Sequence, residues 1–139
     1  MAKVPATQPA VLELLNQALR LEYSIIIHYP RLMNMARDAR LKKNISVLGT
    51  DSIGHADAVA AAVRELGGVP AWSFEEPPDS QDMRHIMEVQ LEKEHQAEAL
   101  HCKVADMMLD PEMRDRFYRM SADEKRHAAL VEQILAGMN

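Results

Sequence analysis

Two residues near the end of the chain, Glu124 and His127, have types and a spacing that suit metal binding. On an α-helix, residues three apart project from one face about one turn apart, so a carboxylate and an imidazole can hold the same metal ion. Glu-x-x-His is a common pattern, but this pair falls on an apolar stripe with Met120, Leu130 and Val131. Because a buried, unpaired charge is costly, the pair predicts a compensating cation.

Three further ligand-type residues, Glu22, His55 and Glu94, each lie at the centre of an apolar stripe. Glu22 and His55 are 33 positions apart, as are Glu94 and His127, and the two pairs are offset by 72 positions. We interpret this spacing as a duplicated helical hairpin that brings the groups to one level of a bundle. Each residue alone could be a hydrogen-bonded core group. Together, three carboxylates and two imidazoles without a basic residue in the stripes favour a metal site.

Four helices must position these residues. The chain is 47% apolar with only six aromatic residues, which favours helices over strands. The segment 67–79 is rich in Pro and Gly and can reach about 45 Å, enough to return the chain to the other end of a bundle. We expect Trp72 and Phe74 to hold this segment down by packing, and Gly54 to mark close packing. The first helix is predicted to start at a cap on Thr7 and to run to about Arg37, followed by a turn at 39–43. The second helix is predicted to end at Leu66, before Gly67. The third should run from Asp79 or Ser80 to about Leu109, and the fourth from Asp110 and Pro111 to Ala136.

The sequence therefore predicts an all-α fold, an up-down-down-up four-helix bundle with a long connection between its second and third helices, forming one domain over 1–139. The net charge of −5, with both signs interspersed, predicts neither nucleic acid nor membrane as a partner. A lone Cys102 makes no internal disulfide and fits a reducing compartment. Without a signal peptide or an apolar span, we expect a cytoplasmic protein.

These features resemble the ferritin-like superfamily, and most closely bacterioferritin. The resemblance rests on Glu22 followed seven residues later by Tyr29, on Glu94 before Gln-Ala, on Glu124-x-x-His127, and on His-Ala-Asp from His55 with a later Leu-Gly-Gly-Val-Pro. It implies a site for two irons, in which Glu22 and His55 bind one metal, Glu94 and His127 bind the other, and Glu124 bridges them. It also implies catalytic roles for Glu124 and Tyr29.

The chain departs from the family pattern at one ligand. The 72-position offset makes Ser52 the counterpart of Glu124, so one bridging carboxylate is missing. Asp51 is adjacent and about 40° from His55 around the helix, which makes it a candidate substitute ligand. Ile53 stands where bacterioferritin has its haem-ligating methionine, so haem is not expected.

The resemblance implies an enzyme that oxidises Fe(II) with O₂ or peroxide and holds two irons, or one, per chain. Mn and Zn are possible alternatives, since mixed oxygen and nitrogen ligands suit all three metals. Because Ser52 weakens one half of the site, a non-catalytic bundle with a single metal is an open alternative, as is a helical adaptor with a purely structural polar core. A rubrerythrin-like peroxidase would be closely related to the first of these functions, the enzyme that oxidises Fe(II).

A second apolar patch on the first helix, at Leu21, Tyr23 and Ile27, predicts contact with a partner subunit. We therefore expect a homodimer or a larger homo-oligomer. The chain ends after the fourth helix, without the short fifth helix of larger ferritins, so a 24-subunit shell is not expected.

Overall fold

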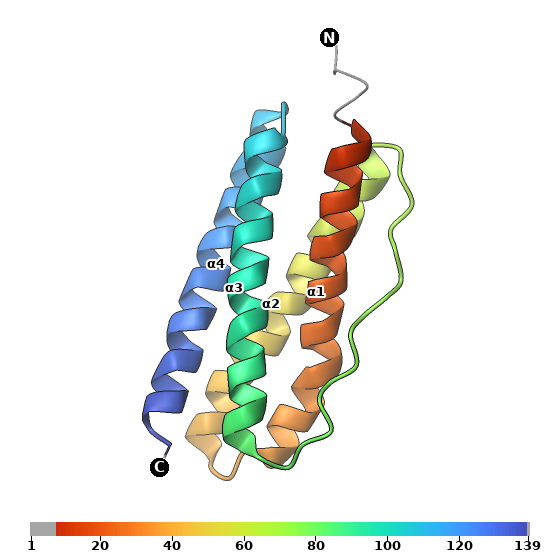
Figure 1. Ribbon diagram of the computed structural model, residues 1–139. Helices are drawn as coiled ribbons and strands as arrows, with labels where there is room; N and C mark the ends of the chain where they lie inside the picture. The colour runs from red at the N-terminus through yellow and green to blue at the C-terminus, as the bar shows by residue number, and fades with distance from the viewer. Residues whose placement is uncertain (1–7, 139) are drawn as a thin grey trace.

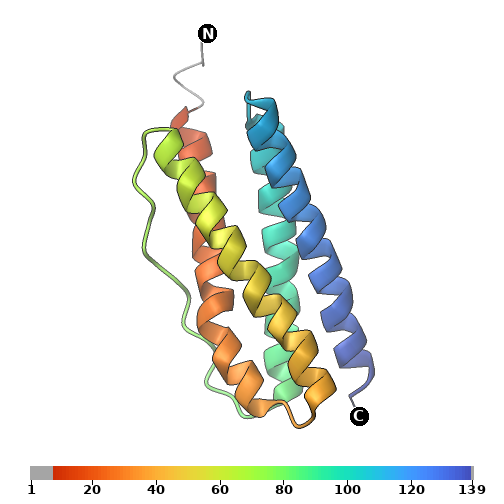
Figure 2. The ribbon, with the colours of Figure 1, turned by 180° about the vertical axis from the view of Figure 1, so that it is seen from behind.

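Four long helices pack side by side in a computed structural model that describes residues 8–138. They are α1 (Gln8–Met35), α2 (Ala39–Glu65), α3 (Met83–Met107) and α4 (Pro111–Ala136). Figures 1 and 2 show α1 and α4 running in one direction and α2 and α3 in the other. This confirms the predicted all-α, up-down-down-up bundle. No helix within the described residues is long and apolar enough to cross a membrane.

Aspartate caps fix the starts of α2 and α3. The backbone N–H of Leu41 donates to Asp38 Oδ1 over 2.8 Å, so α2 begins at Ala39 and the predicted turn at 39–43 is wrong. Asp82 likewise accepts from the backbone N–H of Arg84 over 3.1 Å, which starts α3 later than predicted. An aspartate at this position satisfies N–H groups that have no partner within the helix. The cap predicted at Thr7 lies outside the described residues.

The end of α2 follows the prediction. Gly67 has φ 83°, a left-handed conformation that costs glycine little. Its N–H donates to Arg64 O over 3.0 Å, and the N–H of Gly68 donates to Val63 O over 2.9 Å. These two bonds form a Schellman motif that satisfies the last carbonyls of the helix.

The segment between α2 and α3 runs along the outside of α1 for nearly the length of the bundle (Figure 2). Polar contacts attach it: the N–H of Ala71 donates to Asn16 Oδ1 over 2.8 Å. Trp72 packs edge-on against Tyr23 of α1, with ring centroids 4.7 Å apart, as predicted, although 79% of its surface is exposed. Phe74 is 40% exposed.

Two glycines of α2 have opposite surroundings, and the close packing expected at Gly54 occurs at Gly49 instead. Gly54 is exposed, and a Cβ added to it would meet no atom within 4 Å, so close packing does not occur there. Gly49 is the residue that needs to lack a side chain, because its Cβ would overlap the ring of Tyr29 on α1.

The interior has two apolar clusters with a polar layer between them. One cluster gathers around Phe117 and the other around Val131, both on α4, and the polar residues Glu124 and His127 lie between these two in the chain. The other helices follow the same order. Buried members of the first cluster include Leu15, Leu19, Val59 and Val104, and those of the second include Leu32, Leu48, Ile86 and Met87.

Candidate metal centre

The polar layer brings together all five residues that the stripes and spacing singled out. Glu22 comes from α1, His55 from α2, Glu94 from α3, and Glu124 and His127 from α4. Each has at most 6% of its surface exposed. Their helical phase and their equal distance from the turns place them at the same height, as the duplicated hairpin predicted.

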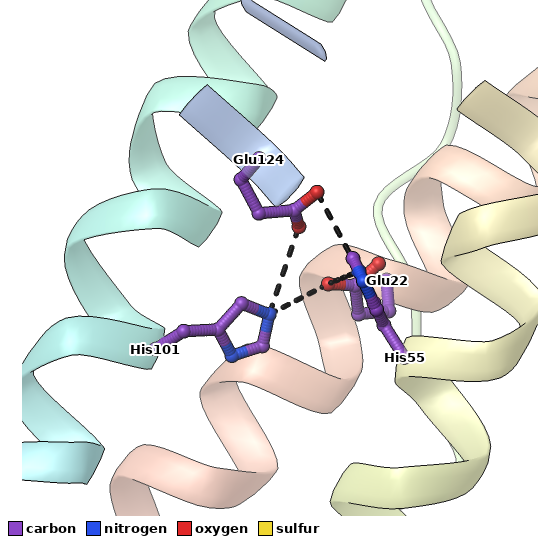
Figure 3. Close-up of side chains that lie close together, drawn as sticks. All are labelled: Glu22, His55, His101 and Glu124. Atoms are coloured by element: carbon purple, nitrogen blue, oxygen red, sulfur yellow. Dashed lines mark hydrogen bonds and ion pairs between the residues drawn. The ribbon is translucent and has the colours of Figure 1, made fainter. Parts of the chain in front are cut away.

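Four ligand atoms form a first group, from Glu22, His55, Glu124 and a residue not predicted as a ligand, His101 of α3 (Figure 3). His101 Nε2 lies 2.8 Å from Glu22 Oε2 and 3.6 Å from Glu124 Oε2. His55 Nδ1 lies 3.5 Å from Glu22 Oε2 and 3.5 Å from Glu124 Oε1. All four ligand atoms lie within 4.8 Å of one another, a spacing compatible with one bound ion.

A second group consists of Glu94, Glu124 and His127. His127 Nδ1 lies 3.0 Å from Glu124 Oε1 and 3.4 Å from Glu94 Oε1. Gln90, buried one turn before Glu94, donates its Nε2–H to Glu94 Oε2 over 2.7 Å and orients that carboxylate. Because Glu124 belongs to both groups, its carboxylate can bridge two metal positions.

Two aspartates lie behind the histidines. Asp123 Oδ2 is 2.9 Å from His55 Nε2, and Asp51 Oδ2 is 2.7 Å from His127 Nε2. In both histidines Nδ1 therefore faces the carboxylates, while Nε2 is held by an aspartate. Such outer contacts fix the orientation of a metal-binding imidazole and raise its basicity. Asp51 was predicted as a substitute bridging ligand, but the structure places it outside both ligand groups because His127 lies between it and the cluster.

Ser52 and Tyr29 do not contribute ligand atoms to either group. Ser52 is fully buried, and its Oγ has no hydrogen-bond partner among the described residues. Serine has no carboxylate, so a second bridging carboxylate opposite Glu124 is missing at this position, as the comparison of the two hairpins indicated. Tyr29, predicted to be catalytic, packs its ring against Gly49 in the apolar cluster around Val131.

The carboxylates create a strong attraction for cations. Burial lowers the pKa of each histidine, but the nearby carboxylates of Glu124 and Glu22 outweigh it and raise the pKa of His55 to about 11 and that of His101 to about 9. The pKa of His127 is raised to about 10, because the carboxylates of Glu124 and Glu94 outweigh its burial. A metal would replace these protons, so its binding should release them and depend on pH.

The pKa values of the three carboxyl groups are shifted in opposite directions. Burial and the nearby charge of Glu124 raise the pKa of Glu22, and burial raises the pKa of Glu94 to about 7. Close contacts with the surrounding imidazoles, led by His101, overcome burial and hold the pKa of Glu124 far below its usual range. The shared carboxylate thus stays ionised at the centre of the layer.

The donor atoms fit a bound metal. Glu22 Oε1, Glu94 Oε1, Glu124 Oε2 and His55 Nδ1 are buried without a hydrogen-bond partner among the described residues. Unpaired buried polar atoms are costly, so atoms of this kind gathered at one point indicate a ligand. Carboxylate oxygens with imidazole nitrogens suit iron, manganese and zinc.

Sequence reasoning missed His101 and Asp123. His101 is seven residues after Glu94, two helical turns along the same stripe, which is the signal that could have identified it. Asp123 precedes Glu124 directly and faces His55 of another helix, a contact that the sequence of one helix does not reveal.

Comparison with known proteins places the chain in a family. The family model described as Ferritin-like domain matches residues 12–139. No curated protein sequence matches the chain.

Solved structures resemble the whole bundle. A ferritin-like, diiron-carboxylate protein from Bacillus anthracis str. Ames is 24% identical, with a TM-score of 0.86, covering 95% of this chain and 99% of that one. Bacterioferritin from Rhodobacter capsulatus is 26% identical, with a TM-score of 0.79 and coverage of 97% and 87%. A dodecameric thioferritin from Bacteroides fragilis is 18% identical, with a TM-score of 0.81 and coverage of 93% and 86%. The family match over most of its length, on a four-helix bundle with a buried layer of Glu and His, shows that this chain belongs to the ferritin-like proteins.

Proposed function

We propose that the protein binds Fe(II) in the polar layer and oxidises it with O₂ or peroxide. The observation that supports this most is the sharing of Glu124 between two groups of ligand atoms, because a bridging carboxylate can hold two metal ions side by side. Each Fe(II) ion that is oxidised supplies one electron, so two oxidation events and two protons convert one O₂ to hydrogen peroxide.

The residues of the layer have separate tasks in this proposal. Glu22, Glu94 and Glu124 provide negative charge that stabilises the higher oxidation state of the metal. Asp51 and Asp123 hold His127 and His55 with Nδ1 directed at the cluster. The apolar clusters on both sides keep bulk water away from the layer.

The test is to add Fe(II) aerobically to metal-free protein and to follow ferric absorbance. Glu124→Gln keeps the shape of the side chain but removes the bridging charge, so the oxidation rate should fall by at least about 100-fold. Glu132→Gln, at an exposed position of the same helix, is the matched control and should behave like the wild type. Equal rates in the wild type and Glu124→Gln would refute the proposal.

A non-catalytic protein that binds a single metal is a second candidate, favoured by the buried Ser52 where a bridging carboxylate is missing. In that case metal-loaded protein should contain one ion per chain and oxidise Fe(II) no faster than buffer. Ser52→Glu should then add a second ion, which elemental analysis would count.

We further propose that the protein is a homo-oligomer and that the face between α1, α2 and the connecting segment is an interface. Ile27 is 43% exposed, Ile53 56% and Trp72 79%, and they line a hollow of about 370 Å³. Leu21, predicted to share this patch, is instead buried in the bundle. Light scattering should show a smaller assembly for Ile53→Lys than for Val47→Lys, which lies on α2 outside the hollow; equal masses would contradict this interface.

A further inference from the structure

The first group of ligand atoms takes one residue from each helix: Glu22 from α1, His55 from α2, His101 from α3 and Glu124 from α4 (Figure 3). The second group takes its residues from α3 and α4 alone, with Glu94 on one and Glu124 and His127 on the other. An ion in the first position would therefore link all four helices. An ion in the second position would link only the α3–α4 hairpin.

His101 is held by its contacts with the carboxylates. Its ring is fully buried and packs on Phe117, with ring centroids 5.8 Å apart. Its Nδ1 has no hydrogen-bond partner among the described residues, whereas His55 and His127 each have an aspartate behind them. Because an unpaired buried nitrogen is unfavourable, the interactions of His101 Nε2 must offset that cost.

The spacing of the first group matches a tetrahedral ion. Ligands about 2.1 Å from a zinc ion lie about 3.4 Å from one another when arranged as a tetrahedron. The contacts of His101 Nε2 with Glu22 and Glu124 measure 2.8 and 3.6 Å, and those of His55 Nδ1 with the same residues measure 3.5 Å each. Two carboxylates and two neutral imidazoles also balance the charge of one divalent cation.

We propose that the two metal positions have different roles, because His101 compensates for the carboxylate lost at Ser52. The first position is closed by four protein ligands and retains a structural divalent cation of the zinc type. The second position has three protein ligands, which leaves a coordination site open for exchangeable Fe(II). Closed four-ligand sites are typical of structural zinc, and sites with an open position are typical of reactive metals.

This inference rests on the proposed function for the role of the second position, but its test does not use iron oxidation. Metal-free full-length protein is loaded with Zn(II), dialysed, and assayed for metal content and thermal unfolding. Wild-type protein should retain one zinc per chain and unfold at a higher temperature than the metal-free form. His101→Leu should lose that zinc and the stabilisation, with affinity reduced by more than about 100-fold.

Glu94→Gln is the matched variant, since it removes a buried ligand from the second group only. It should keep the retained zinc and its stabilisation. If His101→Leu retains zinc like the wild type, or if Glu94→Gln loses the same ion, the assignment of His101 to a closed first position is wrong.

A spectroscopic variant tests ligation without relying on stability. Co(II) can replace Zn(II) as a spectroscopic probe, and wild-type protein with one Co(II) bound per chain should show the intense visible absorption of tetrahedral cobalt. His101→Leu should lose that absorption, and a spectrum that His101→Leu shares with the wild type would overturn the proposal. If zinc retention depends on His101 but Fe(II) is not oxidised, the structural role of the first position stands and the proposed oxidation fails. If Fe(II) is oxidised but zinc retention does not depend on His101, the proposed oxidation stands and this inference fails.

Discussion

Replacing His28 by leucine should make the protein resist acid, because this histidine is buried where protonation is unfavourable. His28 lies on α1 with 1% of its surface exposed, and neither ring nitrogen has a hydrogen-bond partner among the described residues. Burial, followed by the positive charges of Lys93 and Arg31, lowers its pKa from 6.5 to about 4, and the nearby Gln90 offsets little of this.

The sign of the effect follows from proton binding. Between pH 6.5 and 4 the unfolded chain protonates this histidine and the folded chain does not, so His28 makes the protein less stable as pH falls through this range. Each tenfold change in proton affinity corresponds to about 1.4 kcal/mol, so the full loss is about 3 kcal/mol below pH 4. About 2.5 kcal/mol of it should develop between about pH 7.5 and 4.5.

Urea unfolding of metal-free protein, followed by circular dichroism, measures this difference. The quantity of interest is the free energy of unfolding of His28→Leu minus that of the wild type. This difference should be about 2.5 kcal/mol larger at about pH 4.5 than at about pH 7.5. His85→Leu, at an exposed position of α3, is the control for losing a histidine from a helix. If the difference between His28→Leu and the wild type does not change with pH, or if His85→Leu shows the same change, the reasoning is refuted.

Three further substitutions test the packing and the outer contacts. Gly49→Ala should lower the free energy of unfolding by about 1–3 kcal/mol, because its Cβ would overlap Tyr29; an unchanged urea midpoint would show that the ring moves freely. Gly54→Ala should raise it by about 0.4–1 kcal/mol, since α-helical glycine is unfavourable and the site is open, whereas a loss would show that another surface covers this side of α2. Asp123→Asn should weaken metal binding about 10–100-fold by releasing His55 Nε2, as measured by competition with a coloured chelator; unchanged affinity would mean that the aspartate does not orient the ring.

Helix phase and spacing were enough to predict the bundle and five residues of its centre. The stripe on each helix identified which side faces inward, and the repeated interval of 33 positions set Glu22 and His55 at the same level as Glu94 and His127. This worked because a straight helix converts sequence distance directly into height along the bundle. Boundaries were less accurate at α2 and α3, since the capping aspartates there resemble any other polar residue near a turn.

The contacts between helices could not be predicted in this way. A stripe is wide enough to include Glu94 and His101 two turns apart, and only the packing of α3 against α1 and α4 brings His101 Nε2 to Glu22 and Glu124. The same limit applies to Asp51, whose sequence position suggested a ligand but whose carboxylate meets the outer nitrogen of His127. The sequence by itself determined which residues face the core and at what height. The tertiary structure alone decided which atoms meet, because side-chain reach across a helix interface depends on the crossing and rotation of both helices.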